Sequence, residues 1–228
     1  SSNYTPQYWT LSATGEKTIN KVGLEGPLME ASRFLSQATL GADLATIEQV
    51  ANQGIEAWID DQMTVPQSQT LDRLNEVFAE VIEWYLVNGG NPDEVSTRPY
   101  WTIFNYTWWE NHMKNDDLLR QKVALALSEI FVISIESNLS DAGFGLADYY
   151  DILLKHSFGN FEDMLREISL HPCMGYYLSH LNNPREIPEE NIHSDENYAR
   201  EIMQLITIGL YEVNQDGSRQ TDGQGNWI

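Results

Sequence analysis

The chain has 228 residues, of which 42% are hydrophobic and 21% charged, as in an ordinary folded domain. Its 34 acidic and 13 basic side chains give a net charge of −21, which repels phosphate backbones and argues against nucleic-acid binding. The single cysteine, Cys173, excludes an internal disulfide. The sequence contains no run of about 18 apolar residues and therefore predicts no membrane-spanning helix.

Residues 1–26 mix small polar residues with scattered aromatic ones and are predicted to form an extended arm. Beyond Pro27, apolar residues recur at helical spacing, and glycine or proline ends each run. This pattern predicts helices over about 27–41, 43–53, 55–63, 69–88, 99–114, 117–136, 147–157, 160–169 and 173–181. The 117–136 segment is apolar nearly all round, so we expect it to be central. We therefore predict an all-α fold, with a multi-helix orthogonal bundle over residues 27–210.

A polar loop over residues 182–194 leads into a further helix that carries the densest polar cluster of the chain. Loops of that length in compact domains tend to be functional or disordered. In the helix, Glu196 and Arg200 share one face, and Asn197 and Glu201 share another. Apolar residues recur there at spacings of three and four, which predicts a buried stripe made of Ala199, Ile202, Met203, Ile206 and Leu210.

This polar cluster has two interpretations. In the first, Glu196, Arg200 and Glu201 form a buried ion network that fixes the helix to its neighbours, because charges in a half-buried helix must be paired. Alternatively, the glutamates serve acid–base chemistry. Glu196 and Glu201 lie about 140° apart on a helix, so a second carboxylate from another element, such as Glu129, is then needed.

Metal ligation is a further alternative. His171 and His180 flank one predicted helix and are expected to lie within reach of the same glutamates, so a His/Glu site for a transition metal stays open. In the tail, residues 214–223 carry oxygen ligands suited to Ca²⁺ but lack the regular spacing of a calcium loop, which favours turns with solvated carboxylates. The sequence requires no cofactor and leaves the metal unknown.

Two aspartate–glycine pairs in the tail, at Asp216 and Asp222, are hairpin-turn signals. They predict the start of a β-ribbon over residues 211–228. The chain begins without methionine and stops within this segment, so we expect it to be part of a longer polypeptide.

Clustered aromatic residues suggest a ligand-binding surface as the alternative to core packing. Trp108 and Trp109 follow each other on a predicted helix, and exposed tryptophans in an acidic protein are suited to stacking sugars. The candidate ligand-binding set is Asn183, Asn197, Trp108 and Trp109. The candidate catalytic set is Glu196, Arg200, Glu201 and His171.

Several sequence blocks resemble the bacterial domain-of-unknown-function family numbered 1800. The blocks are Ala31–Gly41 (ASRFLSQATLG), Gly54–Gln62 (GIEAWIDDQ), Leu119–Phe131, His156–Phe161, Leu170–Asn183 and Glu196–Glu201 (ENYARE). The resemblance covers most of the chain and implies a helical, typically exported protein of which this chain is the N-terminal half. It also implies a neighbouring partner from a second family, numbered 1501, that looks like the sulfatases. Many members carry a Trp-His-Asn-His-Phe run where this chain reads Leu127–Phe131, so a metal site built on those histidines is not expected here.

These observations lead to one main expectation and two rivals. We expect an accessory module, secreted or in the cell envelope (periplasm or outer surface), that binds a partner protein or a polymer such as a polysaccharide. The first rival is a hydrolase acting on an extracellular polymer, with Glu196, Arg200, Glu201 and His171 lining its site. The second is a structural subunit of a surface assembly, with residues 1–26 exchanged between neighbours.

Overall fold

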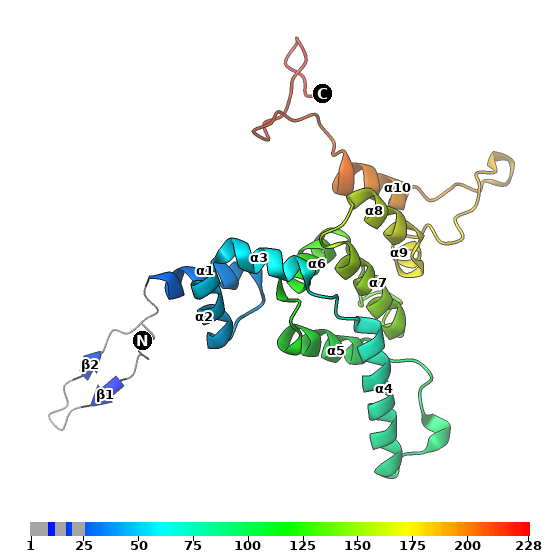
Figure 1. Cartoon of the computed structure of the whole chain (residues 1–228). Helices are drawn as coiled ribbons and strands as arrows, with labels where there is room; N and C mark the ends of the chain where they lie inside the picture. The colour runs from blue at the N-terminus through cyan, green and yellow to red at the C-terminus, as the bar shows by residue number, and fades with distance from the viewer. Residues whose placement is uncertain (1–8, 12–16, 20–25) are drawn as a thin grey trace. The chain divides into compact units, whose positions relative to one another are not determined.

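Helices make up most of the structure, a computed structural model that describes residues 9–11, 17–19 and 26–228 (Figure 1). Strands β1 (Trp9–Leu11) and β2 (Lys17–Ile19) pair in antiparallel register, with Trp9 opposite Ile19. The remainder of the predicted arm over 1–26 lies outside the described residues, except for Gly26. Exchange of this arm between neighbours therefore stays a prediction.

The helices follow the predicted order along the chain. They are α1 (Pro27–Ala38), α2 (Leu44–Gln53), α3 (Ile55–Thr64), α4 (Thr70–Val87), η1 (Pro92–Glu94), α5 (Trp101–Lys114), α6 (Leu118–Ile130), α7 (Gly143–His156), α8 (Phe161–Leu170), α9 (Pro172–Tyr177), η2 (Pro188–Glu190), α10 (Asn197–Glu201) and the π-helix η3 (Ile202–Thr207). The all-α fold is thus confirmed. Within the described ranges, no helix is both long and apolar enough to cross a membrane.

The chain divides into two compact units. Unit 1 comprises Ser1–Ser68 and Trp108–Leu125, and unit 2 comprises Gln69–Thr107 and Ala126–Ile228. The predicted division into an arm (1–26), a helical domain (27–210) and the start of a β-ribbon (211–228) stays a prediction.

Unit 1 is built on α1, α2 and α3, which pack in chain order. Their core consists of Ala31, Leu35, Val50 and Trp58, each at most 2% exposed. The Asp43 carboxylate accepts a hydrogen bond from the Thr46 amide at 2.8 Å and so begins α2 with a side-chain cap. Gly54 separates α2 from α3 at φ 91°, a conformation that favours glycine.

Unit 2 is organised around α7, which packs against α4, α8 and α9. Its buried side chains include Leu146, Ala147, Tyr149, Tyr150, Leu153 and Leu154. Asp151, on the same helix, accepts hydrogen bonds from the amides of Thr70 at 2.7 Å and Leu71 at 2.9 Å. Because no side chain of α4 itself caps its N-terminus, Asp151 performs that role from α7. Burial raises the pKa of Asp151 above its ordinary value, although both hydrogen bonds oppose that shift.

Helix α6 is shorter than predicted. The sequence predicts a central helix to about residue 136, whereas α6 ends at Ile130, and both Glu129 and Ile130 are exposed. The phenolic hydroxyl of Tyr149 donates a hydrogen bond to the Phe131 carbonyl at 2.8 Å. This tertiary contact satisfies a carbonyl group that a continued helix would have used.

The tail beyond Gly209 forms two turns with isolated bridges, between Val213 and Arg219 and between Thr221 and Trp227. The Asp216 carboxylate accepts hydrogen bonds from the Ser218 hydroxyl and amide, which lower its pKa. The Arg219 guanidinium lies 4.2 Å from the ring centroids of both Tyr211 and Trp227. A turn closed by hydrogen bonds to the Asp216 carboxylate and this cation–π contact therefore organise the tail locally.

Candidate functional site

Glu129 and Glu201 line the same pocket of unit 2, which has a volume of about 520 Å³. They come from different elements, since Glu129 lies in the last turn of α6 and Glu201 ends α10. The other lining residues are Ile130, Val132, Met174, Tyr177, Leu178, Leu205 and Ile206. None of these described lining residues is basic. The pocket therefore offers two carboxylates in an otherwise largely apolar wall.

Helix α10 lies beside α8 (Figure 1). One tyrosine fastens the two helices to each other. The Tyr198 hydroxyl donates a hydrogen bond to the Ser169 hydroxyl, and burial raises the pKa of Tyr198. Its ring stacks on His180, with centroids 3.9 Å apart. The Nε2–H of His180 in turn donates to the Ser169 carbonyl at 2.9 Å. These contacts fix the face of α10 that carries Tyr198, and thereby the position of Glu201 in the pocket wall.

Asn183 closes the base of the loop over residues 182–194. Its side-chain amide donates to the Asp195 carbonyl at 2.6 Å, and its side-chain oxygen accepts from the Asp195 amide at 2.8 Å. The Asp195 carboxylate accepts from the Asn197 amide at 2.8 Å, at the first residue of α10. Asn183 and Asn197, both in the candidate ligand-binding set, thus take part in holding the loop and the helix start.

The buried ion network predicted for α10 is wrong for Glu196 and Arg200. They form an ion pair one helical turn apart, and their side chains are 75% and 54% exposed. The partly buried residues of α10 and the start of η3 are Tyr198, Glu201 and Ile202, which follow each other at helical spacing. The Glu196–Arg200 pair occupies another face, and neither residue lines the glutamate pocket.

The predicted buried stripe is also wrong in most of its members. Ala199, Met203 and Leu210 are exposed, whereas Ile202 and Ile206 are partly buried. The helix changes to π geometry over Ile202–Thr207 and ends there, two residues before Gly209, whose φ is 83°. The prediction assumed a continuous α-helical period, which a π segment does not keep.

His171 serves as the N-cap of α9. Its Nδ1 accepts a hydrogen bond from the Cys173 amide at 3.2 Å, so Nε2 carries the proton and donates to Asp148 at 3.2 Å. Burial lowers the pKa of His171 and raises that of the neighbouring Cys173 thiol to about 11. Both ring nitrogens are therefore engaged, and His171 does not line the glutamate pocket.

Trp108 and Trp109 belong to unit 1, whereas Asn183 and Asn197 belong to unit 2. The two indoles meet edge to face, with centroids 4.9 Å apart, and Trp108 also packs on the His112 ring at 3.7 Å. Trp109 is 55% exposed and lines a separate pocket of about 420 Å³ together with Asp43 and His112. The candidate ligand-binding set is thus divided between the units.

No group of three or more His, Cys, Asp or Glu side chains is arranged to hold a metal ion in the part of the chain that the structure describes. His180, one of the histidines considered for such a site, is instead engaged with Tyr198 and Ser169.

A family described as a protein of unknown function, DUF1800, matches residues 33–224. The chain belongs to the DUF1800 family. The matched range contains both pocket glutamates, the helix α10 and the residues that fasten it. No curated protein and no solved structure matches this DUF1800 chain. Its function therefore has to be argued from the site.

Sequence reasoning missed several parts of the DUF1800 site. Tyr198 lies inside the Glu-Asn-Tyr-Ala-Arg-Glu block, yet its spacing gave no sign that it would bond Ser169 and stack on His180. Met174 and Tyr177, which line the pocket from α9, look like ordinary core residues in the sequence. Both features depend on how α8, α9 and α10 meet.

Proposed function

We propose that this DUF1800 chain is an accessory binding module of the cell surface that accepts a basic side chain of a partner protein in the pocket of Glu129 and Glu201. The observation that carries the proposal is the composition of that pocket, two carboxylates in a largely apolar wall with no basic residue among its described lining. The finer architecture proposed with it is an orthogonal helix bundle that continues into a β-ribbon.

A lysine or arginine side chain fits this lining because it combines an apolar stem with a charged head. The stem packs against residues such as Ile130 and Leu178, while the head reaches a carboxylate. The net charge of −21 attracts a basic partner over a longer range and accelerates its approach.

Two further observations support a location outside the cytoplasm. The resemblance of the sequence blocks to this family implies an exported protein, and strong acidity keeps such a surface soluble and monodisperse. The same resemblance names the candidate partner, a sulfatase-like protein of the family numbered 1501.

The test is binding of a short synthetic peptide of alternating lysine and leucine, measured by isothermal titration calorimetry with Glu129→Gln, Glu201→Gln and their combination. We expect the combined variant to bind about tenfold more weakly, which corresponds to about 1.4 kcal/mol. Glu196→Gln is the matched control, because it makes the same change at the residue directly before α10, outside the pocket. Equal affinity of all variants, or equal binding of a peptide with norleucine in place of lysine, contradicts the proposal.

A hydrolase acting on an extracellular polymer is the second candidate. The observation that favours it is that two carboxylates from separate elements line one pocket, as acid–base cleavage of a glycosidic bond requires. Release of reducing ends from a polysaccharide panel would support it if Glu129→Gln and Glu201→Gln each abolish turnover while the circular dichroism spectrum is unchanged. Release that persists in both variants rules this pocket out as the catalytic site.

A further inference from the structure

A second pocket of unit 2 has a different chemistry and is independent of the proposal above. It has a volume of about 340 Å³ and lies between α4, the segment after η1 and the start of α5. Its lining consists of Phe78, Val81, Ile82, Trp84, Tyr85, Glu94, Val95, Ser96, Tyr100, Thr102 and Ile103. Four of these residues are aromatic and one, Glu94, carries a charge.

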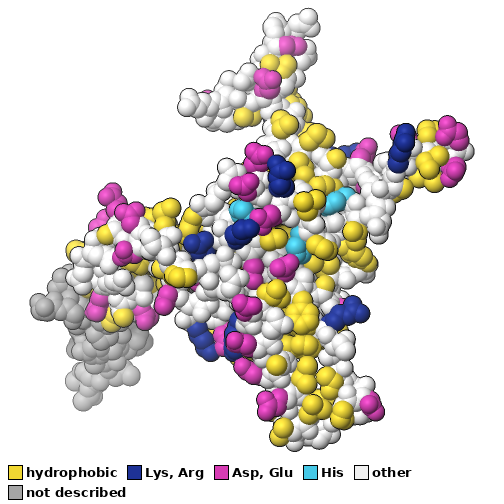
Figure 2. All heavy atoms as spheres, turned by 45° about the vertical axis from the view of Figure 1, so that its right-hand side comes forward, with side chains coloured by type: hydrophobic (Ala, Val, Ile, Leu, Met, Phe, Trp, Pro, Cys, Tyr) yellow, Lys and Arg dark blue, Asp and Glu magenta, His cyan; other side chains and the backbone are white. Residues whose placement is uncertain are grey.

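Part of this aromatic lining is exposed to solvent. Trp84 is 67% and Tyr100 53% exposed, and Val81 beside them is 43% exposed. Figure 2 shows hydrophobic side chains gathered over α4 in the lower part of the view. A contiguous apolar surface of this kind on a folded protein marks a binding site for a ligand or partner.

The turn after α4 holds two of the lining side chains in place. The Tyr85 hydroxyl accepts a hydrogen bond from the Asn91 amide at 3.2 Å, and the Asn91 side chain donates to the Glu94 carboxylate at 3.1 Å. Gly90 lies directly against the Tyr85 ring, since a Cβ there would come within 2.5 Å of it. Asn91 thus orients an aromatic ring and a carboxylate toward fixed positions before any ligand arrives.

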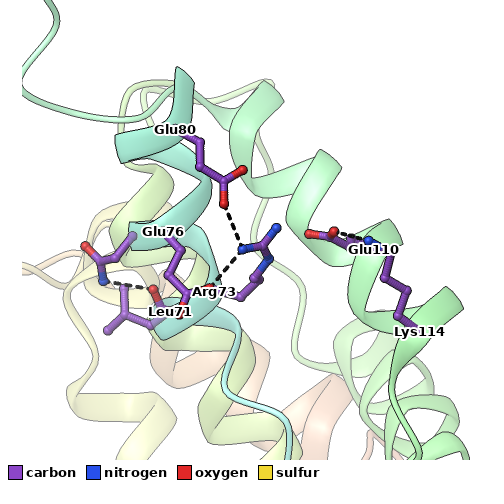
Figure 3. A network of polar contacts seen from close by, with 7 residues as sticks. Leu71, Arg73, Glu76, Glu80, Glu110 and Lys114 are labelled. Carbon is purple, nitrogen blue, oxygen red and sulfur yellow. Dashed lines mark hydrogen bonds and ion pairs between the residues drawn. The ribbon is translucent and has the colours of Figure 1, made fainter. Parts of the chain in front are cut away.

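The charge of the lining is negative. Elsewhere on α4, Arg73 neutralises its neighbours by pairing with Glu76 at 2.8 Å and Glu80 at 3.2 Å (Figure 3). Glu94, by contrast, is bonded by a neutral amide, and none of the described residues lining this pocket is basic. The lining therefore suits a cation that also prefers aromatic faces.

We propose that the pocket of Trp84, Tyr85, Tyr100 and Glu94 binds a quaternary ammonium group. Such a group has no N–H donors and sheds water easily, so it needs no hydrogen-bond acceptors from an apolar wall. A primary ammonium carries three N–H donors that the aromatic faces accept less well than water does, so it gains less from this lining than a quaternary group. The ligand is either a free small solute of the choline type or the choline headgroup of a lipid.

The first experiment titrates choline into the full chain by calorimetry and compares it with 3,3-dimethylbutan-1-ol, its neutral carbon isostere. We expect choline to bind at least about fivefold more tightly, because only the cation gains the attraction of the rings and the carboxylate. Equal binding of the isostere, or no binding of choline at tens of millimolar, overturns the proposal.

Variants then locate the site. Trp84→Ala should weaken choline binding at least fivefold, and Glu94→Gln severalfold, with little risk of unfolding because Trp84 is mostly exposed. Tyr106→Ala, another exposed aromatic residue of unit 2 that does not line the pocket, is the control and should bind normally. Unchanged affinity in Trp84→Ala contradicts the assignment to this pocket.

Vesicle flotation distinguishes the two sources of the ligand. Flotation with phosphatidylcholine vesicles that free choline abolishes assigns the site to a lipid headgroup. Choline binding without flotation assigns it to a free solute. Flotation that choline does not displace, and that Trp84→Ala retains, shows that the pocket is not responsible.

Discussion

Helices α7 and α10 belong to the same unit but are held by different forces. Helix α7 is buried along most of its length, with Leu153 and Leu154 fully inaccessible to solvent. Helix α10 has no buried residue and is fastened through Tyr198 and the Asn183–Asp195 contacts. Hydrophobic burial thus stabilises the centre of unit 2, whereas a few polar contacts position the carboxylate of Glu201. Changes in α7 should therefore alter stability, and changes in α10 should alter the site.

The largest effect is expected from Leu154→Ala. The side chain is fully buried, so its removal leaves a cavity and should lower the free energy of unfolding by about 2–5 kcal/mol. Urea unfolding followed by circular dichroism measures this loss. Leu170→Ala is the matched control, because Leu170 is 79% exposed and should change stability by less than about 0.5 kcal/mol. Similar losses in both variants would contradict the central place of α7.

A smaller loss is expected from Asp151→Ala. This change removes the acceptor of the Thr70 and Leu71 amides and leaves the N-terminus of α4 without its cap. The free energy of unfolding should fall by about 1–3 kcal/mol. Asp72→Ala, which removes an exposed carboxylate from the first turn of the same helix, should cost about 1 kcal/mol or less. An equal loss in both variants would show that the contact from α7 adds nothing.

Asp151 also makes the free energy of unfolding depend on pH, in the direction opposite to that of most carboxylates. Burial raises its pKa in the folded protein above the ordinary value of 3.8, so the folded state binds the proton more tightly than the unfolded chain. The contribution of Asp151 to stability should therefore increase as the pH falls through its folded pKa toward 3.8. The difference in unfolding free energy between the wild type and Asp151→Asn isolates this term from the other carboxylates. A difference that decreases toward low pH would mean that the hydrogen bonds from Thr70 and Leu71 outweigh burial.

The sequence predicts most helices because their ends are encoded locally. Asp43 caps α2, Asn160 accepts from the Asp163 amide at the start of α8, and Pro172 is the first residue of α9. The end of α6 was not predictable in this way, because the contact from Tyr149 to the Phe131 carbonyl joins residues 18 positions apart.

The candidate site shows the same limit. The need for a second carboxylate beside Glu201 follows from helix geometry, and the structure brings Glu129 to the same pocket. The positions of Glu196, Arg200 and His171 outside this pocket could not be predicted from the sequence, because each depends on which face of a short helix turns toward a neighbour. The π segment after Glu201 ends the α-helical period on which that inference relied.

The smallest change in stability is expected from Tyr198→Phe. This variant also tests most directly how α10 is held. The variant keeps the ring on His180 but loses the hydrogen bond to Ser169, which should cost about 0.5–1.5 kcal/mol. Hydrogen exchange should show faster exchange at residues 197–207 and unchanged protection in α7, because the contact fastens α10 alone. Tyr106→Phe, at an exposed tyrosine of α5, provides the control. If protection falls equally in α7 and α10, the two helices open together. The contrast between a stabilising centre and a separately fastened site would then not hold.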